Sequence, residues 1–384
     1  MDNGITIRYI FWKFFRLGLT AFGGPAMVAY IKELSVNQNK WLDEETFKDG
    51  VVLCQSVPGA TAMQMAAYVG LRTRGVAGAL ASFLGFGLPA FILLMILSSM
   101  YAAFHEAPKI VSLFNGLQVV VVAIVANATW SFGKSTFKNY KDLILAIAAA
   151  SLLWAGVSPF IVILGAAFSG VTLRRDTGIS ATSDVRAKNR HSVKYFFALI
   201  LILFLGLFAV YFINAKLFNL AALMMRIDLF AFGGGFASVP LMLHEIVDVR
   251  GWMDSKTFMD GIALGQVTPG PIVITSTFVG YMVYGIAGAI VATIAIFTPS
   301  FLMVIAITPV MDRLKTSAWF LRATKGIFAS FVGLLFYVTA KFALAVPWDV
   351  IRVVLVCAVF VALCKKVDIL YVVLAAAAVS AFIF

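Results

Sequence analysis

Long apolar stretches alternate with short polar intervals from one end of the chain to the other. In the first part the apolar stretches cover residues 8–31, 43–72, 75–103, 110–133, 142–154 and 158–172. Most reach the roughly 20 residues that a helix needs to cross a bilayer. The pattern therefore predicts an all-α polytopic membrane protein.

Two of these stretches, 142–154 and 158–172, are short for full spans, and so are 350–363 and 368–384 near the end of the chain. Each pair is expected to form a full hairpin or a tilted or re-entrant one. Whether the paired helices cross the whole bilayer is left open by their length.

The sequence repeats itself 210 or 211 residues further along. RLGLTAFGGPA (Arg16–Ala26) matches RIDLFAFGGGF (Arg226–Phe236), and GVAGALASFLGFGLPAF (Gly75–Phe91) matches GIAGAIVATIAIFTPSF (Gly285–Phe301). A constant spacing of this kind indicates a duplicated unit.

Basic residues predict how the two halves lie in the membrane. The interval Leu173–Lys194 carries six Lys or Arg against two Asp, as cytoplasmic loops do. Arg72 and Arg74 also read as cytoplasmic, whereas their counterparts, Tyr281–Tyr284, are uncharged. The loops rich in Lys and Arg therefore lie at opposite ends of the helices in the two halves. One linker helix, Tyr195–Ile213, would produce this reversal, so inverted repeats are expected.

The expected organisation is therefore two inverted repeats of about six helical elements each, with a linker helix that brings the total to about 13. The N-terminus is expected in the cytoplasm and the C-terminus outside. The three parts are the first repeat, the cytoplasmic basic loop with the linker helix, and the second repeat, at residues 1–172, 173–218 and 219–384.

Composition limits the class of function. The chain is 62% hydrophobic and only 12% charged, and its net charge of +12 is explained by basic cytoplasmic loops rather than by nucleic-acid binding. The longest polar interval is too short to fold as a soluble catalytic domain. The first residues lack the cleavage pattern of a signal peptide, so the first apolar segment is expected to stay in the protein.

Metal and catalytic chemistry have little support in the sequence. The three cysteines show no metal-ligand spacing, and the three histidines are scattered. A membrane-embedded enzyme would need a cluster of acid, base or nucleophile at mid-membrane depth. We therefore expect no enzyme, no bound metal and no cofactor.

Two helices are interrupted at matching places, by Pro58-Gly59 and by Pro269-Gly270-Pro271. The helix before the first break is expected to be capped by Asp43, with Glu44 and Glu45 in its first turn. Proline cannot continue a helix, and each restart exposes up to four N–H groups and the positive end of a helix dipole.

Such helix starts bind anions, and in inverted-repeat folds they converge near the midplane. Neutral donors surround both breaks, and the predicted oxyanion site comprises Pro58, Gly59, Ala60, Thr61, Gln64, Gln55, Pro269, Gly270, Pro271, Gln266, Thr275 and Ser276, with Thr277 beside them. The alternative is a pair of proline kinks whose freed carbonyls are satisfied by Ser and Thr.

Further residues are candidates for the path of the anion. The glycine pairs are expected either to allow close helix packing or to form a second discontinuity. The arginines before them are either interfacial anchors or electropositive gates. These candidates are Gly23, Gly24, Pro25, Gly233, Gly234, Arg16 and Arg226. Weaker candidates for proton coupling are Asp49, Asp260, Glu33 and Glu245.

The motifs AFGGPA, SVPGATAMQMAAYVG and GLPAF, repeated as AFGGGF, VTPGPIVITSTFVGY and FTPSF, resemble those of the chromate ion transporter family in its long two-repeat form. The resemblance covers nearly the whole chain. It implies a secondary transporter in the bacterial or archaeal inner membrane that exports chromate, confers chromate resistance and draws on the proton motive force, as an antiporter does.

The family motifs fall on Phe22, Gly23, Gly24, Pro25, Pro58, Gly59, Phe232, Gly233, Gly234, Pro269, Gly270 and Pro271. The halves are not equivalent, since Gly235 stands opposite Pro25 and Ala60 opposite Pro271. The implied partners are a chromate-like or sulfate-like oxyanion and the lipid bilayer, with no nucleic acid and with a homodimer left open. A transporter of sulfate or another oxyanion and a passive anion channel of the same fold remain the alternatives.

Overall fold

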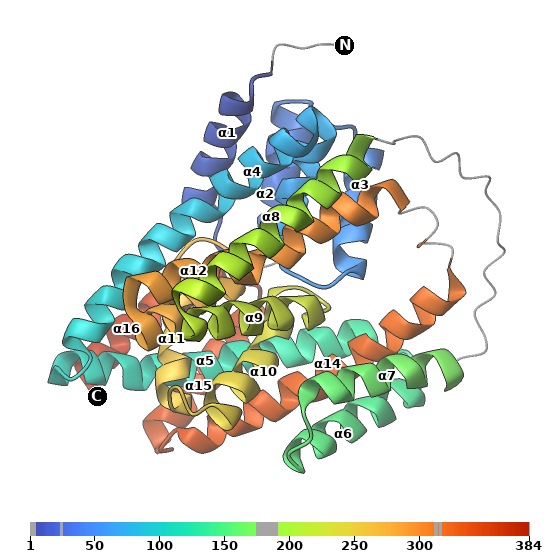
Figure 1. Ribbon diagram of the computed structural model, residues 1–384. Helices are drawn as coiled ribbons and strands as arrows, with labels where there is room; N and C mark the ends of the chain where they lie inside the picture. The colour runs from blue at the N-terminus through green and yellow to red at the C-terminus, as the bar shows by residue number, and fades with distance from the viewer. Residues whose placement is uncertain (1–4, 24–25, 174–190, 311–313, 315–316, 384) are drawn as a thin grey trace. The chain divides into compact units, whose positions relative to one another are not determined.

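The computed structural model describes residues 5–23, 26–173, 191–310, 314 and 317–383, with the side chains of residues 173, 191–197, 382 and 383 left aside. All regular structure in these ranges is helical, apart from one isolated bridge between Pro58 and Phe232 (Figure 1). The expectation of an all-helical fold is confirmed.

The helices of the first repeat are α1 (Ile7–Thr20), α2 (Ala26–Lys32), the π-helix η1 (Glu33–Gln38), α3 (Glu44–Ser56), α4 (Thr61–Phe104), α5 (Pro108–Thr136), α6 (Tyr140–Trp154) and α7 (Pro159–Leu173). The expected linker helix is α8 (His191–Ile213). The basic loop before it lies largely outside the described residues.

The second repeat contains α9 (Ala215–Phe230), the 3₁₀ turn η2 (Gly235–Ala237), α10 (Ser238–Met242), the π-helix η3 (Leu243–Val249), α11 (Ser255–Val267), the 3₁₀ turn η4 (Ile272–Ile274), α12 (Thr275–Ile307), the 3₁₀ turn η5 (Thr308–Val310), α14 (Ala318–Ala345), α15 (Val350–Cys364) and α16 (Ile369–Ile383).

The duplication is visible in the structure as well as in the sequence. The bounds of α5, α6 and α7 recur in α14, α15 and α16 after 210 residues, except that α14 ends one residue earlier. Both α4 and α12 bend sharply at a matching glycine, Gly75 with φ +64° and Gly285 with φ +62°, a backbone conformation that other residues adopt at a cost. The bend in α4 separates the expected apolar stretches 43–72 and 75–103.

Small residues let the two arms of each bent helix pack closely. A Cβ atom at Gly70 would lie 2.2 Å from the carbonyl oxygen of Gly78, and one at Gly280 would lie 2.2 Å from that of Gly288. Close approach through glycine is typical of helices packed inside a membrane. Each of α4 and α12 is therefore a tight helical hairpin rather than one straight rod.

The expected stretch 8–31 is not one helix. α1 ends at Thr20 and α2 begins at Ala26, and Gly23 between them has φ +83°. In the second repeat, Gly233 and Gly234 likewise have φ values of +99° and +93°. Of the two interpretations of the glycine pairs, the discontinuity is therefore present in both repeats. Gly24 and Pro25 lie outside the described residues.

Helix capping follows the expected chemistry at the start of α3. The Asp43 carboxylate accepts the backbone N–H of Thr46 at 2.7 Å, and this hydrogen bond lowers the pKa of Asp43 from its ordinary value. Asp254 accepts the N–H of Thr257 at 2.8 Å at the matching place before α11. The predicted N-cap is confirmed, and it recurs in the second half.

The helices pack into two compact units, and each unit draws on both repeats. The first unit contains α1, α2, α3, α4 up to Ile96, α8, α9 and α12, with α12 packed against α8 and α9. The second contains α5, α6, α7, α10, α11, α14, α15 and α16, with the α6–α7 hairpin packed against α14 (Figure 1).

Four helical segments are long and apolar enough to cross a membrane, judged by length and composition within the described ranges. They are Thr61–Phe104, Pro108–Thr136, Ile272–Val310 and Ala318–Ala345. The shorter apolar helices are Pro159–Thr172, Ala198–Ile213, Val350–Cys364 and Ile369–Ala381, so three of the four helices of the paired hairpins are among them. The fold is therefore that of a multi-pass helical membrane protein.

Candidate functional site

The first break is completed by backbone from the second repeat. α3 ends at Ser56 and α4 begins at Thr61, and Pro58 pairs with Phe232 in the isolated bridge. The N–H of Gly59 donates to the carbonyl oxygen of Ala231 at 2.9 Å. Backbone groups freed by a helix break need partners inside a membrane, and the AFGG loop of the other repeat supplies them here.

The second break has the reciprocal arrangement. The N–H of Gly270 donates to the carbonyl oxygen of Ala21 at 3.1 Å. Gly270 is the repeat mate of Gly59, and Ala21 is the repeat mate of Ala231. Each Pro-Gly break is thus paired with the AFGG loop of the opposite repeat, and all four segments lie in the first unit.

Glycine is required at the centre of both breaks. Gly59 has φ +119° and Gly270 has φ +121°. A Cβ atom at Gly59 would lie 2.0 Å from Ser300 Oγ and 2.7 Å from Gln64 Nε2, and one at Gly270 would lie 2.7 Å from Ala90 Cβ. A side chain at either place would be strained by its backbone and would overlap its neighbours.

The two helix starts offer different numbers of free donors. At the first break the N–H of Ala60 is already bonded to Ser300 Oγ at 3.1 Å, which leaves the N–H groups of the first turn of α4. At the second break Pro271 has no N–H, and the 3₁₀ turn η4 uses the N–H of Ile274 to bond the Pro271 carbonyl at 2.9 Å. Both helix starts therefore expose fewer than the four free N–H groups that were expected as the maximum.

Two polar side chains beside the breaks are fully buried, and each has an atom without a partner in the described part of the chain. Gln64 donates from Nε2 to the Pro58 carbonyl at 2.6 Å, but its Oε1 has no partner. The Ser276 hydroxyl also has none. Buried polar atoms are rarely left unpaired, so these two atoms are candidates for contact with a ligand.

The neighbouring hydroxyl groups differ from Ser276 because they are already engaged. Thr275 donates to the Ile272 carbonyl at 2.8 Å, and Thr277 shares a hydrogen bond of 2.7 Å with Thr293. Thr61 lies against the glycine loop, where a Cβ atom at Gly234 would approach its Oγ1 to 3.2 Å. The structure thus brings Thr61, Gly59 and the second glycine pair together.

Several predicted residues are not among those that the hydrogen bonds described above join at the breaks. The side chains of Gln55, Arg16 and Arg226 are exposed, and that of Asp49 is half-buried. Gln266 is half-buried and belongs to the second unit. Glu33 is exposed and accepts hydrogen bonds from Asn37 and Gln38 within its own π-helix.

Asp260 is buried in the second unit with neutral partners. It accepts the Tyr101 hydroxyl at 2.8 Å on one oxygen and the Gln118 amide at 2.9 Å on the other. Its repeat mate, Asp49, is less buried. Of the two aspartates singled out in the sequence, Asp260 is the one that the fold withdraws from water.

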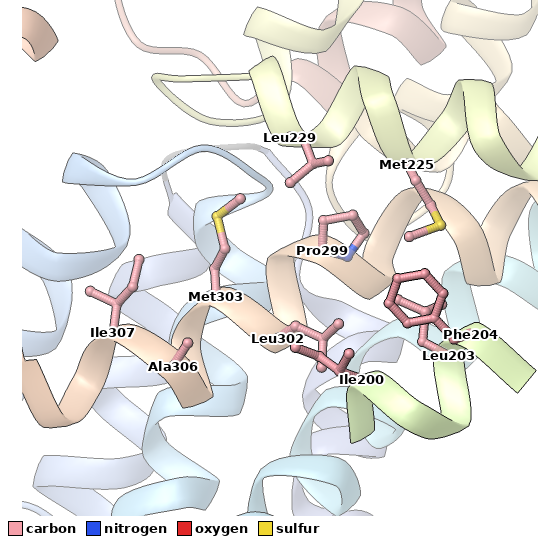
Figure 2. Close-up of a pocket in the computed structure, with 10 residues that line it drawn as sticks. All are labelled: Ile200, Leu203, Phe204, Met225, Leu229, Pro299, Leu302, Met303, Ala306 and Ile307. Carbon is pink, nitrogen blue, oxygen red and sulfur yellow. The ribbon is translucent and has the colours of Figure 1, made fainter. Parts of the chain in front are cut away.

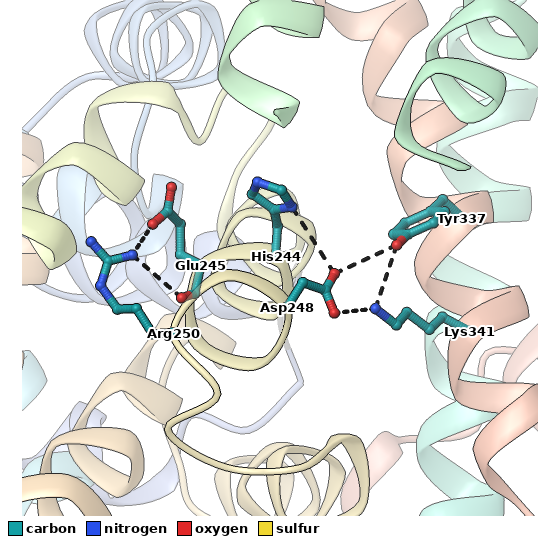
Figure 3. A network of polar contacts seen from close by, with 6 residues as sticks. All are labelled: His244, Glu245, Asp248, Arg250, Tyr337 and Lys341. Atoms are coloured by element: carbon teal, nitrogen blue, oxygen red, sulfur yellow. Dashed lines mark hydrogen bonds and ion pairs between the residues drawn. The ribbon is translucent and has the colours of Figure 1, made fainter. Parts of the chain in front are cut away.

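Glu245 belongs to a network of ion pairs around the π-helix η3 (Figure 3). It pairs with Arg250. Asp248 on the same helix pairs with Lys341 of α14, and the Tyr337 hydroxyl lies 3.5 Å from it. The first ion pair stabilises the end of η3, and the second joins η3 to α14, so both pairs stabilise the fold.

Sequence reasoning missed Asp228, which is fully buried near the end of α9. Its Oδ2 accepts both the backbone N–H and the hydroxyl of Ser300, at 2.8 and 2.7 Å. Its Oδ1 has no partner in the described part of the chain. A usable signal existed, because the repeat mates of Asp228 and Ser300 are Gly18 and Ala90, and a carboxyl group gained on one side only is conspicuous.

The cavity drawn in Figure 2, of about 310 Å³, lies among α8, α9 and α12 and is apolar. Its walls are Ile200, Leu203, Phe204, Met225, Leu229, Pro299, Leu302, Met303, Ala306 and Ile307. This lining offers no donor to an oxyanion. Within the described ranges no group of three His, Cys, Asp or Glu side chains is placed to hold a metal ion.

Comparison with known proteins identifies the family. The profile described as "Chromate transporter" matches residues 8–171 and again residues 218–381. The chain belongs to the chromate transporter family. The resemblance seen in the AFGG and Pro-Gly motifs is confirmed, and the double match corresponds to the long two-repeat form.

Three relatives in this family cover most of the chain. An uncharacterized transporter of Methanocaldococcus jannaschii is 46% identical over 97% of this chain and 93% of its own length. The chromate transport protein of Cupriavidus metallidurans is 28% identical over 85% of this chain and 80% of its own. A probable chromate transport protein of Synechococcus elongatus is 29% identical over 80% and 77%. No solved structure matches.

Membership in the chromate transporter family makes this a membrane transport protein. The described parts of the motifs that carry the family resemblance are the segments that meet at the breaks. Ala21 and Ala231 come from the two AFGG loops, and Gly59 and Gly270 from the two Pro-Gly breaks. The family motifs of both halves therefore build one structural feature in the first unit.

Proposed function

We propose that this protein is a secondary active transporter that exports chromate, a tetrahedral divalent oxyanion, across the inner membrane. The observation that carries the proposal is the reciprocal pairing of the two breaks, through Gly59 with Ala231 and Gly270 with Ala21. The names of the Cupriavidus and Synechococcus relatives support chromate as the ion.

The chemistry of the breaks suits an oxyanion. Backbone N–H groups at a helix start and neutral hydroxyl groups can replace the water around the ion, and the helix dipole favours its negative charge. The buried and unpaired hydroxyl of Ser276 is a donor of this kind. The proposed binding residues are Pro58, Gly59, Ala60, Thr61, Gln64, Pro269, Gly270, Pro271, Thr275, Ser276, Gly23, Gly24, Pro25, Gly233 and Gly234.

Four other residues keep more distant roles in the proposal. Gln55 and Gln266 stand just before the breaks, and Arg16 and Arg226 attract anions toward the membrane from exposed positions. Exposed basic side chains raise the local anion concentration without holding the ion tightly.

The proposed architecture is a pair of inverted repeats, at residues 1–172 and 219–384, with the loop and linker helix at 173–218 between them. About 13 segments would then place the N-terminus in the cytoplasm and the C-terminus outside. Reciprocal bonding between repeat mates supports a two-fold relation between the halves, because such a relation turns each contact into its counterpart.

Export is proposed to draw on the proton motive force. A divalent anion leaving a cell moves down the inside-negative potential, which is worth about 2.3 kcal/mol per charge for each 100 mV. Asp49, Asp260, Glu33 and Glu245 are the candidate proton carriers from the sequence. Of these, Asp260 is buried with neutral partners, whereas Glu245 is paired with Arg250.

Flux in proteoliposomes tests the proposal. Purified protein is reconstituted, and labelled chromate and sulfate are followed with and without an imposed potential and pH gradient. The proposal expects chromate flux that a gradient can drive uphill. Flux that only dissipates a chromate gradient would show a passive channel, sulfate flux without chromate flux would show a different oxyanion, and no oxyanion flux would refute the proposal.

A further inference from the structure

Within the described part of the chain, the buried carboxyl group of Asp228 forms no ion pair. Its side chain is 0% exposed, and its two hydrogen bonds come from neutral donors of Ser300. An ionisable side chain in the interior of a membrane protein without a paired charge is a candidate functional residue.

The described side chains of α12 and α8, the helices that pack against α9, bring no charge to Asp228. α12 carries no Asp, Glu, Lys, Arg or His from Thr275 to Ile307, and its titratable side chains are Tyr281 and Tyr284. Among the described side chains of α8, residues 198–213, the only titratable group is that of Tyr211. Residues 57–67, around the first break, contain no titratable group. On α9 itself, Lys216 lies three turns away. The Arg226 side chain is exposed, and it leaves α9 roughly 200° around the helix axis from that of Asp228.

Hydrogen bonds connect Asp228 to the start of α4. The hydroxyl of Ser300 donates to Asp228 Oδ2 at 2.7 Å and accepts the N–H of Ala60 at 3.1 Å. Gln64, whose Oε1 is unpaired, approaches the same point, because Ser300 Oγ and Gln64 Nε2 both lie where a side chain of Gly59 would be. Two hydrogen bonds therefore separate the carboxyl group from the proposed oxyanion site.

The fold does not need these polar groups for packing. At the matching place in the other half, Gly270 packs on Ala90 as Gly59 packs on Ser300, and Gly18 stands where Asp228 would be. The same crossing is built there without a carboxyl or a hydroxyl group. The Asp228–Ser300 pair is thus a chemical addition to one side of a symmetric frame.

We propose that Asp228 is a proton-binding residue of the transport site, and that its proton and the oxyanion at the start of α4 favour each other's binding. The inference rests on the proposed function. An ionised Asp228 repels the anion, whereas a protonated one does not, and by linkage the bound anion holds the proton in place. One proton carried outward with one divalent oxyanion leaves a net charge of −1, so this coupling draws on the electrical part of the proton motive force and works against its pH gradient.

The test compares wild-type protein with Asp228→Asn in detergent. Chromate is added to weakly buffered samples between pH 6 and pH 8, and proton uptake and affinity are measured. Chromate itself binds a proton in this pH range. The proton uptake measured with Asp228→Asn therefore gives the part that comes from chromate alone. Wild type should take up as much as one proton more per bound chromate than Asp228→Asn does. As the pH rises, the chromate affinity of wild type should fall at least about fivefold more than that of the variant.

Asp260→Asn tests the rival assignment, since Asp260 is also buried with neutral donors and is a candidate proton carrier of the proposed function. If Asp228 binds the proton that accompanies chromate, Asp260→Asn keeps the proton uptake of wild type. If Asp260→Asn loses the uptake and Asp228→Asn keeps it, the assignment to Asp228 is overturned. Equal uptake in wild type and Asp228→Asn overturns it as well.

Ser300→Ala tests the connection and replaces Asp228→Asn if that variant does not fold. It introduces the residue that the first repeat has at position 90. In wild type, chromate affinity depends on pH more strongly than the protonation of chromate alone explains, and in Ser300→Ala this additional dependence should fall to less than about half. An unchanged pH dependence of the affinity contradicts the proposal. Failure of wild type to bind chromate at all would instead refute the proposed function.

Discussion

Gly59 donates its backbone N–H to the carbonyl oxygen of Ala231, which lies 172 positions further along the chain and 2.9 Å away. The bond joins the Pro-Gly break of one repeat to the glycine loop of the other. Its counterpart, from Gly270 to Ala21, does the same in reverse. The breaks are therefore fixed structural features with defined partners, and this makes them testable one atom at a time.

Replacing Gly59 by alanine should destabilise the protein. The new Cβ would overlap Ser300 Oγ, and the backbone there has φ +119°. Overpacking alone costs about 1–3 kcal/mol, and the strained backbone adds about 1–2 kcal/mol. The measurement is the midpoint of thermal unfolding or aggregation of purified protein in detergent.

Gly165→Ala is the control for that measurement. Gly165 lies in α7 with an ordinary helical backbone, and a Cβ atom there would have no neighbour within 4 Å. Alanine favours a helix over glycine by about 1 kcal/mol, so this variant should be as stable as wild type or more so. Equal losses in both variants would show that Gly59 is not under special constraint.

Ser276→Ala should weaken oxyanion binding without harming stability. The hydroxyl is buried and unpaired, so the folded protein loses no hydrogen bond when it is removed. If it donates to the anion, affinity should fall about tenfold, equivalent to about 1.4 kcal/mol. Chromate titration and thermal stability are measured on the same preparation.

Thr277→Val should give the opposite pattern. Its hydroxyl is bonded to Thr293, so its loss should cost about 0.6 kcal/mol of stability, the typical value between membrane helices. Its affinity for chromate should remain that of wild type. A Ser276→Ala variant that binds like wild type would remove Ser276 from the site.

Divalent tetrahedral oxyanions should compete with chromate far better than chloride does. Neutral donors and a helix dipole respond to charge and shape, which sulfate and chromate share. Chromate uptake into proteoliposomes is measured with sulfate or chloride in large excess. Uptake that sulfate leaves untouched would show that charge and shape alone are not recognised.

The orientation of the repeats is tested by the position of the chain ends. A tag at the N-terminus and one after Gly178 should be cytoplasmic, and a tag at the C-terminus should be outside. Accessibility to an impermeant reagent in intact cells distinguishes the two sides. A cytoplasmic C-terminus would contradict the odd number of spans and, with it, the inverted repeats.

Much of this fold could be predicted from local signals in the sequence. The helix breaks at Pro58-Gly59 and Pro269-Gly270-Pro271 were predictable because proline and glycine act on their own backbone. The cap at Asp43 followed from its place before Glu44 and Glu45. The duplication was visible because both copies keep the same spacing.

The state of each polar group could not be predicted in this way. Gln55 and Gln64 look alike in the sequence, yet one is exposed and the other is fully buried with an unpaired oxygen. Ser276 and Thr277 are neighbours, yet only Thr277 meets a partner hydroxyl. The role of Asp228 depends on Ser300, 72 positions away, which only packing brings near.

The exchange of partners between breaks and loops also has a genetic consequence. Because the break around Gly59 is completed by Ala231, and that around Gly270 by Ala21, neither half can satisfy its own interrupted backbone. We therefore expect a gene cut after codon 172 to yield two incomplete polypeptides, with transport restored only in cells that make both. Fusion of the two copies into one reading frame guarantees that each half is always synthesised beside the partner it depends on.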